Sequence, residues 1–149
     1  MPEYPQPLVE VVEDMESITD RSERADLLIE TADRFDSVRV PPEIATKPYP
    51  ESARAPACES EAFVWAIDQP DGTLKYYFDV LNPQGLSAMA MSVILGETLS
   101  GQPLEQVAHV PGDIVFRVFG KELTMGKGAG LMGILSLVQH EARKRLRND

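Results

Sequence analysis

Apolar residues recur at spacings of three and four along the first third of the chain, which predicts helices rather than strands. The first stripe predicts a helix near the N-terminus, and its members are Leu8, Val11, Val12, Met15 and Ile18. Asp20 followed by Glu23 resembles a capping box and predicts the start of a second helix. The apolar stripe of that second helix consists of Ala25, Leu28, Ala32 and Phe35.

The pattern then changes to one typical of strands. Residues 37–57 contain five of the chain's twelve prolines, which predicts an extended, rigid connection. Residues 62–67 and 73–80 are rich in aromatic and β-branched side chains, and the five residues between them end in Asp71-Gly72. This combination indicates a β-hairpin.

The second half of the chain returns to helical patterns. Residues 86–99 are apolar on nearly all sides, which predicts a helix buried in the core that stops at Gly101 and Pro103. Residues 104–107 suggest a further helical turn, and residues 114–119 fit a strand and a helix equally well. The final helix has an apolar stripe of Leu131, Ile134, Leu135, Val138 and Ala142. The order predicts one α+β domain over residues 1–149, with a small antiparallel sheet packed against helices.

The net negative charge of the chain limits the kinds of partner that it can bind. The 149-residue chain has a formal net charge of −10, and residues 1–61 carry 15 acidic and 6 basic side chains. This acidity argues against nucleic-acid binding and suggests a partner with a basic surface. The N-terminal residues lack the pattern of a secretory signal, and no apolar run is long enough to cross a bilayer. We therefore expect no membrane association and a reducing, cytoplasmic location.

Two nucleotide-binding motifs are matched only in part by the glycines near the last helix. Gly128, Gly130 and Gly133 match the G-x-G-x-x-G spacing, but the chain ends 16 residues after Gly133, too soon for the acidic residue and the βαβ unit that a dinucleotide site needs. Lys127 does not complete a phosphate-binding loop either, because Lys121 occupies the position of its first glycine. We interpret the cluster of Gly126, Gly128 and Gly130 as a flexible or tightly turned approach to the last helix.

Cys58 is the only cysteine, and it lies where the proline-rich segment meets the first predicted strand. A single thiol cannot hold a zinc ion or an iron–sulfur cluster alone, but it can act as a nucleophile or carry a group covalently. Three interpretations remain open from these residues: a small buried apolar side chain, a covalent carrier, and a hydrolase nucleophile paired with His109 or His140.

The arrangement of elements resembles the SufE and CsdE family of sulfur acceptors in iron–sulfur cluster assembly. In that family, two helices are followed by a loop ending in Gly-Cys-Gln-Ser, a hairpin and a buried helix. The last helix of the family is approached through the motif Arg-x-x-Gly-Leu. Residues 57–60, which read Ala-Cys-Glu-Ser, stand at the cysteine motif, and residues 127–131 stand at the start of the last helix. Ala57 replaces the family's glycine, Glu59 its glutamine, Phe63 its usual tryptophan and Lys127 its arginine.

The resemblance implies that Cys58 accepts sulfur from the persulfide of a PLP-dependent, SufS-like cysteine desulfurase and passes it to a SufBCD-like scaffold. It also implies stimulation of the desulfurase and no cofactor bound to this chain. A non-catalytic adaptor of the same fold is the alternative. We expect Arg54 or Lys127 to favour the thiolate and Glu59 and Glu61 to oppose it. The predicted supporting or partner-binding residues are Arg54, Glu59, Ser60, Lys127, Gly130 and Leu131.

Overall fold

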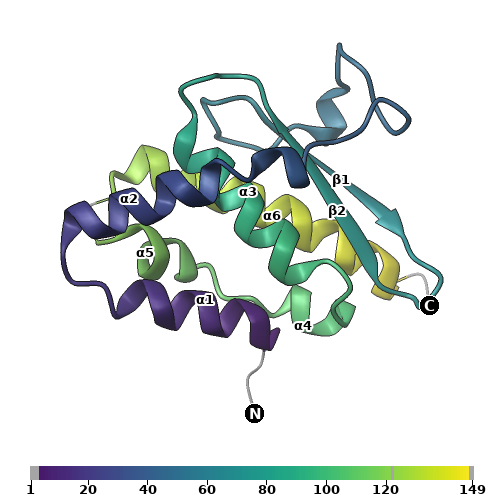
Figure 1. The fold of residues 1–149 in the computed structure, drawn as a ribbon. Helices are drawn as coiled ribbons and strands as arrows, with labels where there is room; N and C mark the ends of the chain where they lie inside the picture. The colour runs from purple at the N-terminus through teal and green to yellow at the C-terminus, as the bar shows by residue number, and fades with distance from the viewer. Residues whose placement is uncertain (1–3, 122, 148–149) are drawn as a thin grey trace.

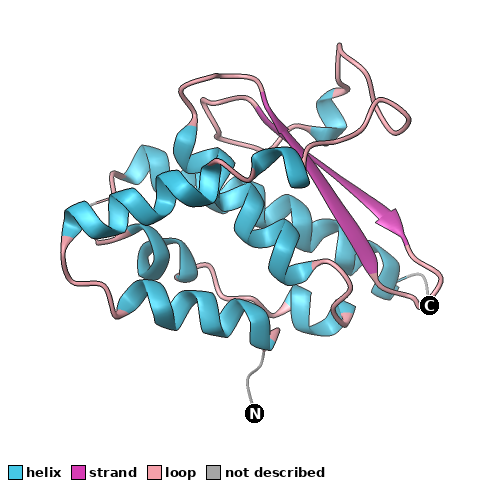
Figure 2. Ribbon diagram, in the orientation of Figure 1, coloured by secondary structure: helices cyan, strands magenta, loops and turns pink. Residues whose placement is uncertain are grey.

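The computed structural model describes residues 4–121 and 123–147, which form an α+β fold with a two-stranded antiparallel sheet (Figure 1). The elements in chain order are α1 (Gln6–Glu16), α2 (Arg21–Ala32), the 3-10 turns η1 (Phe35–Ser37) and η2 (Glu51–Ala53), β1 (Ala62–Asp68), β2 (Leu74–Val80), α3 (Leu86–Leu99), α4 (Leu104–Ala108), α5 (Ile114–Phe119) and α6 (Met125–Arg147). The hairpin lies along one side of the helices (Figure 2). The predicted fold class is confirmed.

The hairpin has an inner and an outer face because side chains alternate along each strand. Val64 pairs with Phe78 on the inner face, and both are buried against the helices. Trp65 pairs with Tyr77 on the outer face, and both are half-buried. Gly72, with φ at 87°, allows the connecting turn that the sequence predicted.

Helix α3 is the centre of the core, as its apolar pattern predicted. It packs against β2, α1, α2 and α6, so nearly every side of it is covered. Leu95 and Leu99 are fully buried, and burial of each such side chain contributes roughly 1.5–3 kcal/mol. Gly96 allows the close approach of Val38, whose Cγ1 would lie 2.6 Å from a Cβ at that position.

Three local predictions need correction or are resolved by the structure. Residues 114–119, which fitted a strand and a helix equally, form helix α5. Phe35 was assigned to the second helix, but α2 ends at Ala32 and Phe35 lies in η1, where it is still buried. The Asp20 side chain caps α2, although its Oδ1 accepts from the N–H of Ser22 at 3.2 Å and not from that of Glu23.

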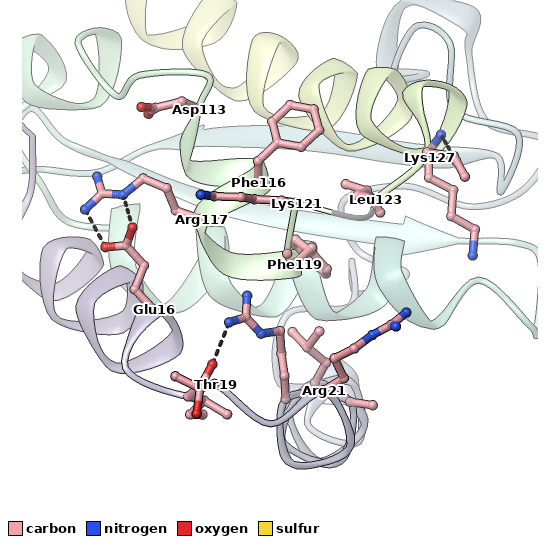
Figure 3. A pocket seen from close by; sticks show the side chains of 16 residues that line it. Glu16, Thr19, Arg21, Asp113, Phe116, Arg117, Phe119, Lys121, Leu123 and Lys127 are labelled. Atoms are coloured by element: carbon pink, nitrogen blue, oxygen red, sulfur yellow. Dashed lines mark hydrogen bonds and ion pairs between the residues drawn. The ribbon is translucent and has the colours of Figure 1, made fainter.

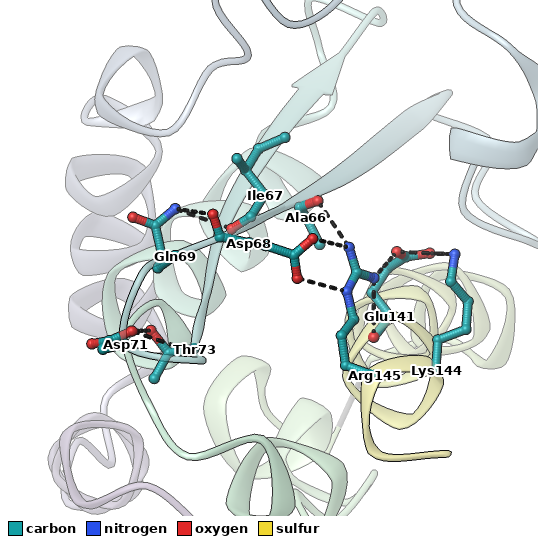
Figure 4. Close-up of polar contacts among 9 residues, drawn as sticks. All are labelled: Ala66, Ile67, Asp68, Gln69, Asp71, Thr73, Glu141, Lys144 and Arg145. Atoms are coloured by element: carbon teal, nitrogen blue, oxygen red, sulfur yellow. Dashed lines mark hydrogen bonds and ion pairs between the residues drawn. The ribbon is translucent and has the colours of Figure 1, made fainter. Parts of the chain in front are cut away.

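The basic C-terminal end of α6 joins this helix to the turn end of the hairpin (Figure 4). Arg145 Nε donates to Asp68 Oδ1 at 3.1 Å, and its Nη1 pairs with Glu141 on the same helix. Lys144 also pairs with Glu141, at 3.4 Å. Within the described residues, no helix is long and apolar enough to cross a membrane.

Candidate functional site

Cys58 lies in a short loop whose ends are tied together. The Ala55 N–H donates to Ala62 O at 2.8 Å, and Arg54 forms an isolated antiparallel bridge with Phe63. Within the loop the Glu61 N–H donates to Cys58 O at 3.2 Å. These bonds hold the loop against the start of β1, as the sequence predicted. Cys58 itself is only 7% exposed.

The loop is held in an unfavourable backbone conformation on both sides of the cysteine. Ala57 has φ at 62° and Glu61 has φ at 54°, and both residues carry a Cβ that disfavours this left-handed region. Each costs of order 1 kcal/mol relative to glycine. The family motif has glycine before the cysteine, so Ala57 stands at a position where the backbone favours glycine. The loop therefore stores strain that a change in its conformation would release.

Glycines of α6 allow this loop to lie directly on the helix. A Cβ at Gly130 would lie 3.2 Å from both Ala57 O and Cys58 Cα, and a Cβ at Gly133 would lie 2.0 Å from Pro56 O. The interpretation of residues 126–130 as a flexible or turned approach was therefore wrong, because α6 already begins at Met125. The spacing of three between Gly130 and Gly133 places both on one helical face and was the signal for this contact. Sequence reasoning missed Pro56 and Gly133.

An open hollow of about 610 Å³ exposes the loop to solvent, and seven residues from Glu51 to Glu59 line it. The charged residues of its lining are Glu51, Arg54 and Glu59. Arg54 is the only basic one among these described residues, and its Nη1 lies 3.9 Å from Glu61 Oε1. The hollow gives access to the loop, and its lining places one cation and two acidic side chains around a thiol that is itself almost fully buried.

The other predicted site residues lie in different places. Ser60 is half-buried, accepts the Asn82 N–H at its carbonyl, and packs so tightly that a Cβ on Gly85 would lie 2.9 Å from it. Leu131 is buried in the core. Lys127 lines another hollow, beside α5, and not the one that contains Cys58. The role predicted for Lys127 stays a prediction.

Neither histidine lines the hollow around Cys58. His109 and His140 are both exposed, and the His109 Nδ1 lies 2.7 Å from Glu105 O in α4, the helix that ends just before His109. No group of three or more potential metal ligands occurs in the described part of the chain. The site therefore consists of one thiol, its strained loop and the glycine face of α6.

An aromatic cluster holds the proline-rich segment before the loop against the outer face of the hairpin. The Tyr49 ring lies 5.1 Å from that of Phe63 and 4.7 Å from that of Trp65. The Tyr49 hydroxyl donates to Asp79 Oδ2 at 2.6 Å, and Arg39 Nη1 lies 3.1 Å from Asp79 Oδ1. Burial, and then the bond to Asp79, raises the pKa of Tyr49 from 10.0 to about 12.

Alkaline pH is expected to weaken this attachment. A tyrosine pKa that is higher in the folded than in the unfolded state contributes stability that is complete below about pH 10 and lost as the pH rises through about 12. Tyr49→Phe removes the titrating group. The free energy of unfolding of Tyr49→Phe, measured in urea between about pH 9 and pH 12, should therefore fall less steeply with rising pH than that of the wild type. Equal slopes for the two proteins would contradict the assignment.

Comparison with known proteins agrees with this architecture. The solution structure of a hypothetical protein from Thermus thermophilus is 27% identical in sequence, with a TM-score of 0.70 over 97% of this chain and 98% of that one. No curated protein matches. The family model described as "SufE: Fe-S metabolism associated domain" matches residues 9–142, which include the loop, the hairpin and most of α6. The chain belongs to the SufE family, which is associated with iron–sulfur metabolism.

Proposed function

We propose that this protein accepts persulfide sulfur from a cysteine desulfurase on Cys58 and passes it to an iron–sulfur cluster scaffold. The observation that carries the proposal is the position of the chain's only thiol, on a strained loop beside an open hollow in a SufE-family domain. The desulfurase is expected to use PLP, whereas this chain needs no bound cofactor for the transfer. Removal of the persulfide from the desulfurase would raise the turnover rate of that enzyme.

The transfer is balanced without an external oxidant. The Cys58 thiolate attacks the outer sulfur of the donor persulfide, the donor's S–S bond breaks, and its electron pair leaves with the donor cysteine as a thiolate. Cys58 then carries the persulfide. A second exchange of the same kind, with an acceptor thiolate attacking the outer sulfur, returns Cys58 to the thiolate.

Burial of Cys58 protects the sulfur but also prevents direct attack. An incoming persulfide must approach the sulfur closely, and a side chain that is 7% exposed offers little surface for this. The loop is therefore expected to move away from α6 when the desulfurase docks. Strain at Ala57 and Glu61 lowers the free-energy cost of that movement. The buried resting position would limit loss of the persulfide to stray thiols and oxidants.

Two alternatives are less well supported. A cysteine hydrolase needs a base within hydrogen-bond reach of the thiol, and neither histidine lines the hollow. A non-catalytic adaptor would not need its only thiol, so it would keep its function in Cys58→Ser. The acidic residues 1–61 favour docking to a basic surface of the desulfurase, with an affinity that falls as salt rises.

Intact-mass spectrometry tests the proposal directly, because the chain has a single thiol. Wild-type protein is incubated with a cysteine desulfurase, PLP and cysteine, and is then measured before and after treatment with a thiol reductant. We expect an adduct of one sulfur atom that the reductant removes. Absence of any adduct, with the desulfurase demonstrably turning over, would favour the adaptor.

A further inference from the structure

A second hollow, of about 890 Å³, lies between the α1–α2 corner, α5 and the start of α6 (Figure 3). We call it the basic hollow, because the described residues of its lining include five basic side chains and two acidic ones. The basic residues are Arg21, Arg24, Arg117, Lys121 and Lys127, and the acidic ones are Glu16 and Asp113. The described residues of its lining thus have a net charge of +3 in a chain of net charge −10.

The basic hollow also has an apolar floor. Half-buried apolar side chains from four parts of the chain line it: Ile18, Leu28, Phe116, Phe119 and Leu123. Apolar surface surrounded by cations suits a ligand that has both carboxylates and apolar side chains. A small inorganic anion would leave the apolar floor uncovered.

Part of the wall is held in place by internal contacts. Arg117 binds Glu16 through two hydrogen bonds of 2.9 and 2.8 Å, and Arg24 Nη2 donates to Ile18 O at 2.6 Å. These contacts join α5 to the last residue of α1, and α2 to the segment between α1 and α2. Lys121 and Lys127 are exposed at its rim.

The negative charge of the rest of the chain favours a short acidic segment over a nucleic acid as the ligand. The rest of the chain has a net charge of −13, so a nucleic acid that extended beyond the hollow would meet a repulsive surface. A short acidic segment would interact mainly with the cations of the hollow, because charges beyond about 8 Å are screened at physiological ionic strength.

We propose that the basic hollow binds an acidic segment of a partner protein, one that places leucine or phenylalanine side chains on the apolar floor. The segment would lie on the opposite side of α6 from the Cys58 loop. A Cβ at Gly128 would lie 3.0 Å from the Phe116 ring in this hollow, whereas Gly130 faces Cys58, and positions two apart on a helix point in nearly opposite directions. The proposal does not depend on sulfur transfer.

Fluorescence anisotropy with the full-length protein tests it. The probe is a labelled synthetic peptide in which two leucines are flanked by glutamates, and the matched peptides replace glutamate by glutamine or leucine by serine. We expect the glutamate–leucine peptide to bind best, with an affinity that falls as salt rises. Lys121→Glu and Arg21→Glu should each weaken binding by about fivefold or more. Lys47→Glu makes the same charge change in the proline-rich segment, outside the hollow, and should not weaken binding.

Several results would overturn the proposal. Equal binding of the glutamate and glutamine peptides would remove the charge argument, and equal effects of Lys121→Glu and Lys47→Glu would remove the hollow as the site. Tighter binding of a thymidine oligonucleotide, or full competition by inorganic phosphate, would show a different class of ligand. Cys58→Ser should bind the peptide as the wild type does, so failure of the sulfur-carrier proposal leaves this result unaffected.

Discussion

Replacement of Cys58 by serine is expected to leave a folded protein that takes up no sulfur. The hydroxyl is close to the thiol in size, so the cost to stability should fall within roughly 0.5–3 kcal/mol. A serine hydroxyl is not ionised at neutral pH without a nearby base, and the hollow contains no histidine to act as one. The sulfur adduct should therefore be absent, and the stimulation of the desulfurase should disappear with it.

The measurement compares the wild type, Cys58→Ser and Cys58→Ala by intact mass and by the rate of alanine release from the desulfurase. Cys58→Ala serves as the control for any effect of the new hydroxyl. Circular dichroism and urea unfolding establish that both variants are folded. Undiminished stimulation by both variants would contradict the carrier mechanism and identify the protein as an adaptor.

Gly133→Ala is expected to destabilise the protein and to expose Cys58. The new Cβ would lie 2.0 Å from Pro56 O and 3.1 Å from Pro56 C, and both are backbone atoms that cannot rotate away. Either the loop or the helix must shift, at a cost of about 2–3 kcal/mol. The gain in helix propensity, up to about 1 kcal/mol, offsets only part of this. A loop displaced from α6 also leaves the thiol more accessible.

Gly126→Ala is the matched control, because it changes the same helix at a position where a Cβ would meet nothing within 4 Å. It should be neutral or slightly stabilising. Gly130→Ala, with its closest contacts at 3.2 Å, should give an intermediate effect. Urea unfolding measures stability, and the rate of reaction with an aromatic disulfide measures the accessibility of the thiol. Equal behaviour of Gly133→Ala and Gly126→Ala would refute the packing argument.

Local sequence patterns predicted the structure correctly where neighbouring residues alone determine it. Residues 86–99, apolar on nearly all sides, form α3 with the predicted bounds, and Asp71-Gly72 marked the turn of the hairpin. The position of Cys58 between the proline-rich segment and the first strand was also predicted correctly. Each of these features depends on residues that are close together in sequence.

The glycines of α6 show where sequence reasoning failed. From the sequence, residues 126–130 indicated flexibility, because glycine weakens an isolated helix. In the folded protein, the contact of Gly130 and Gly133 with the Cys58 loop explains their place in a helix. That contact joins segments more than 70 residues apart, so the spacing of the two glycines could indicate a helix face open to close packing but not which segment lies on it.

By itself, the sequence determined the fold class, the main elements, the single thiol and the resemblance to the SufE family. Only the tertiary structure decided that Cys58 is buried, that its loop is strained at Ala57 and Glu61, and that Lys127 belongs to a different hollow from Arg54. The physical reason is the distance along the sequence between the residues that interact. Helix periodicity, turn preference and nucleophile identity are properties of neighbouring residues, whereas burial, backbone strain and the grouping of charges arise when distant segments pack together.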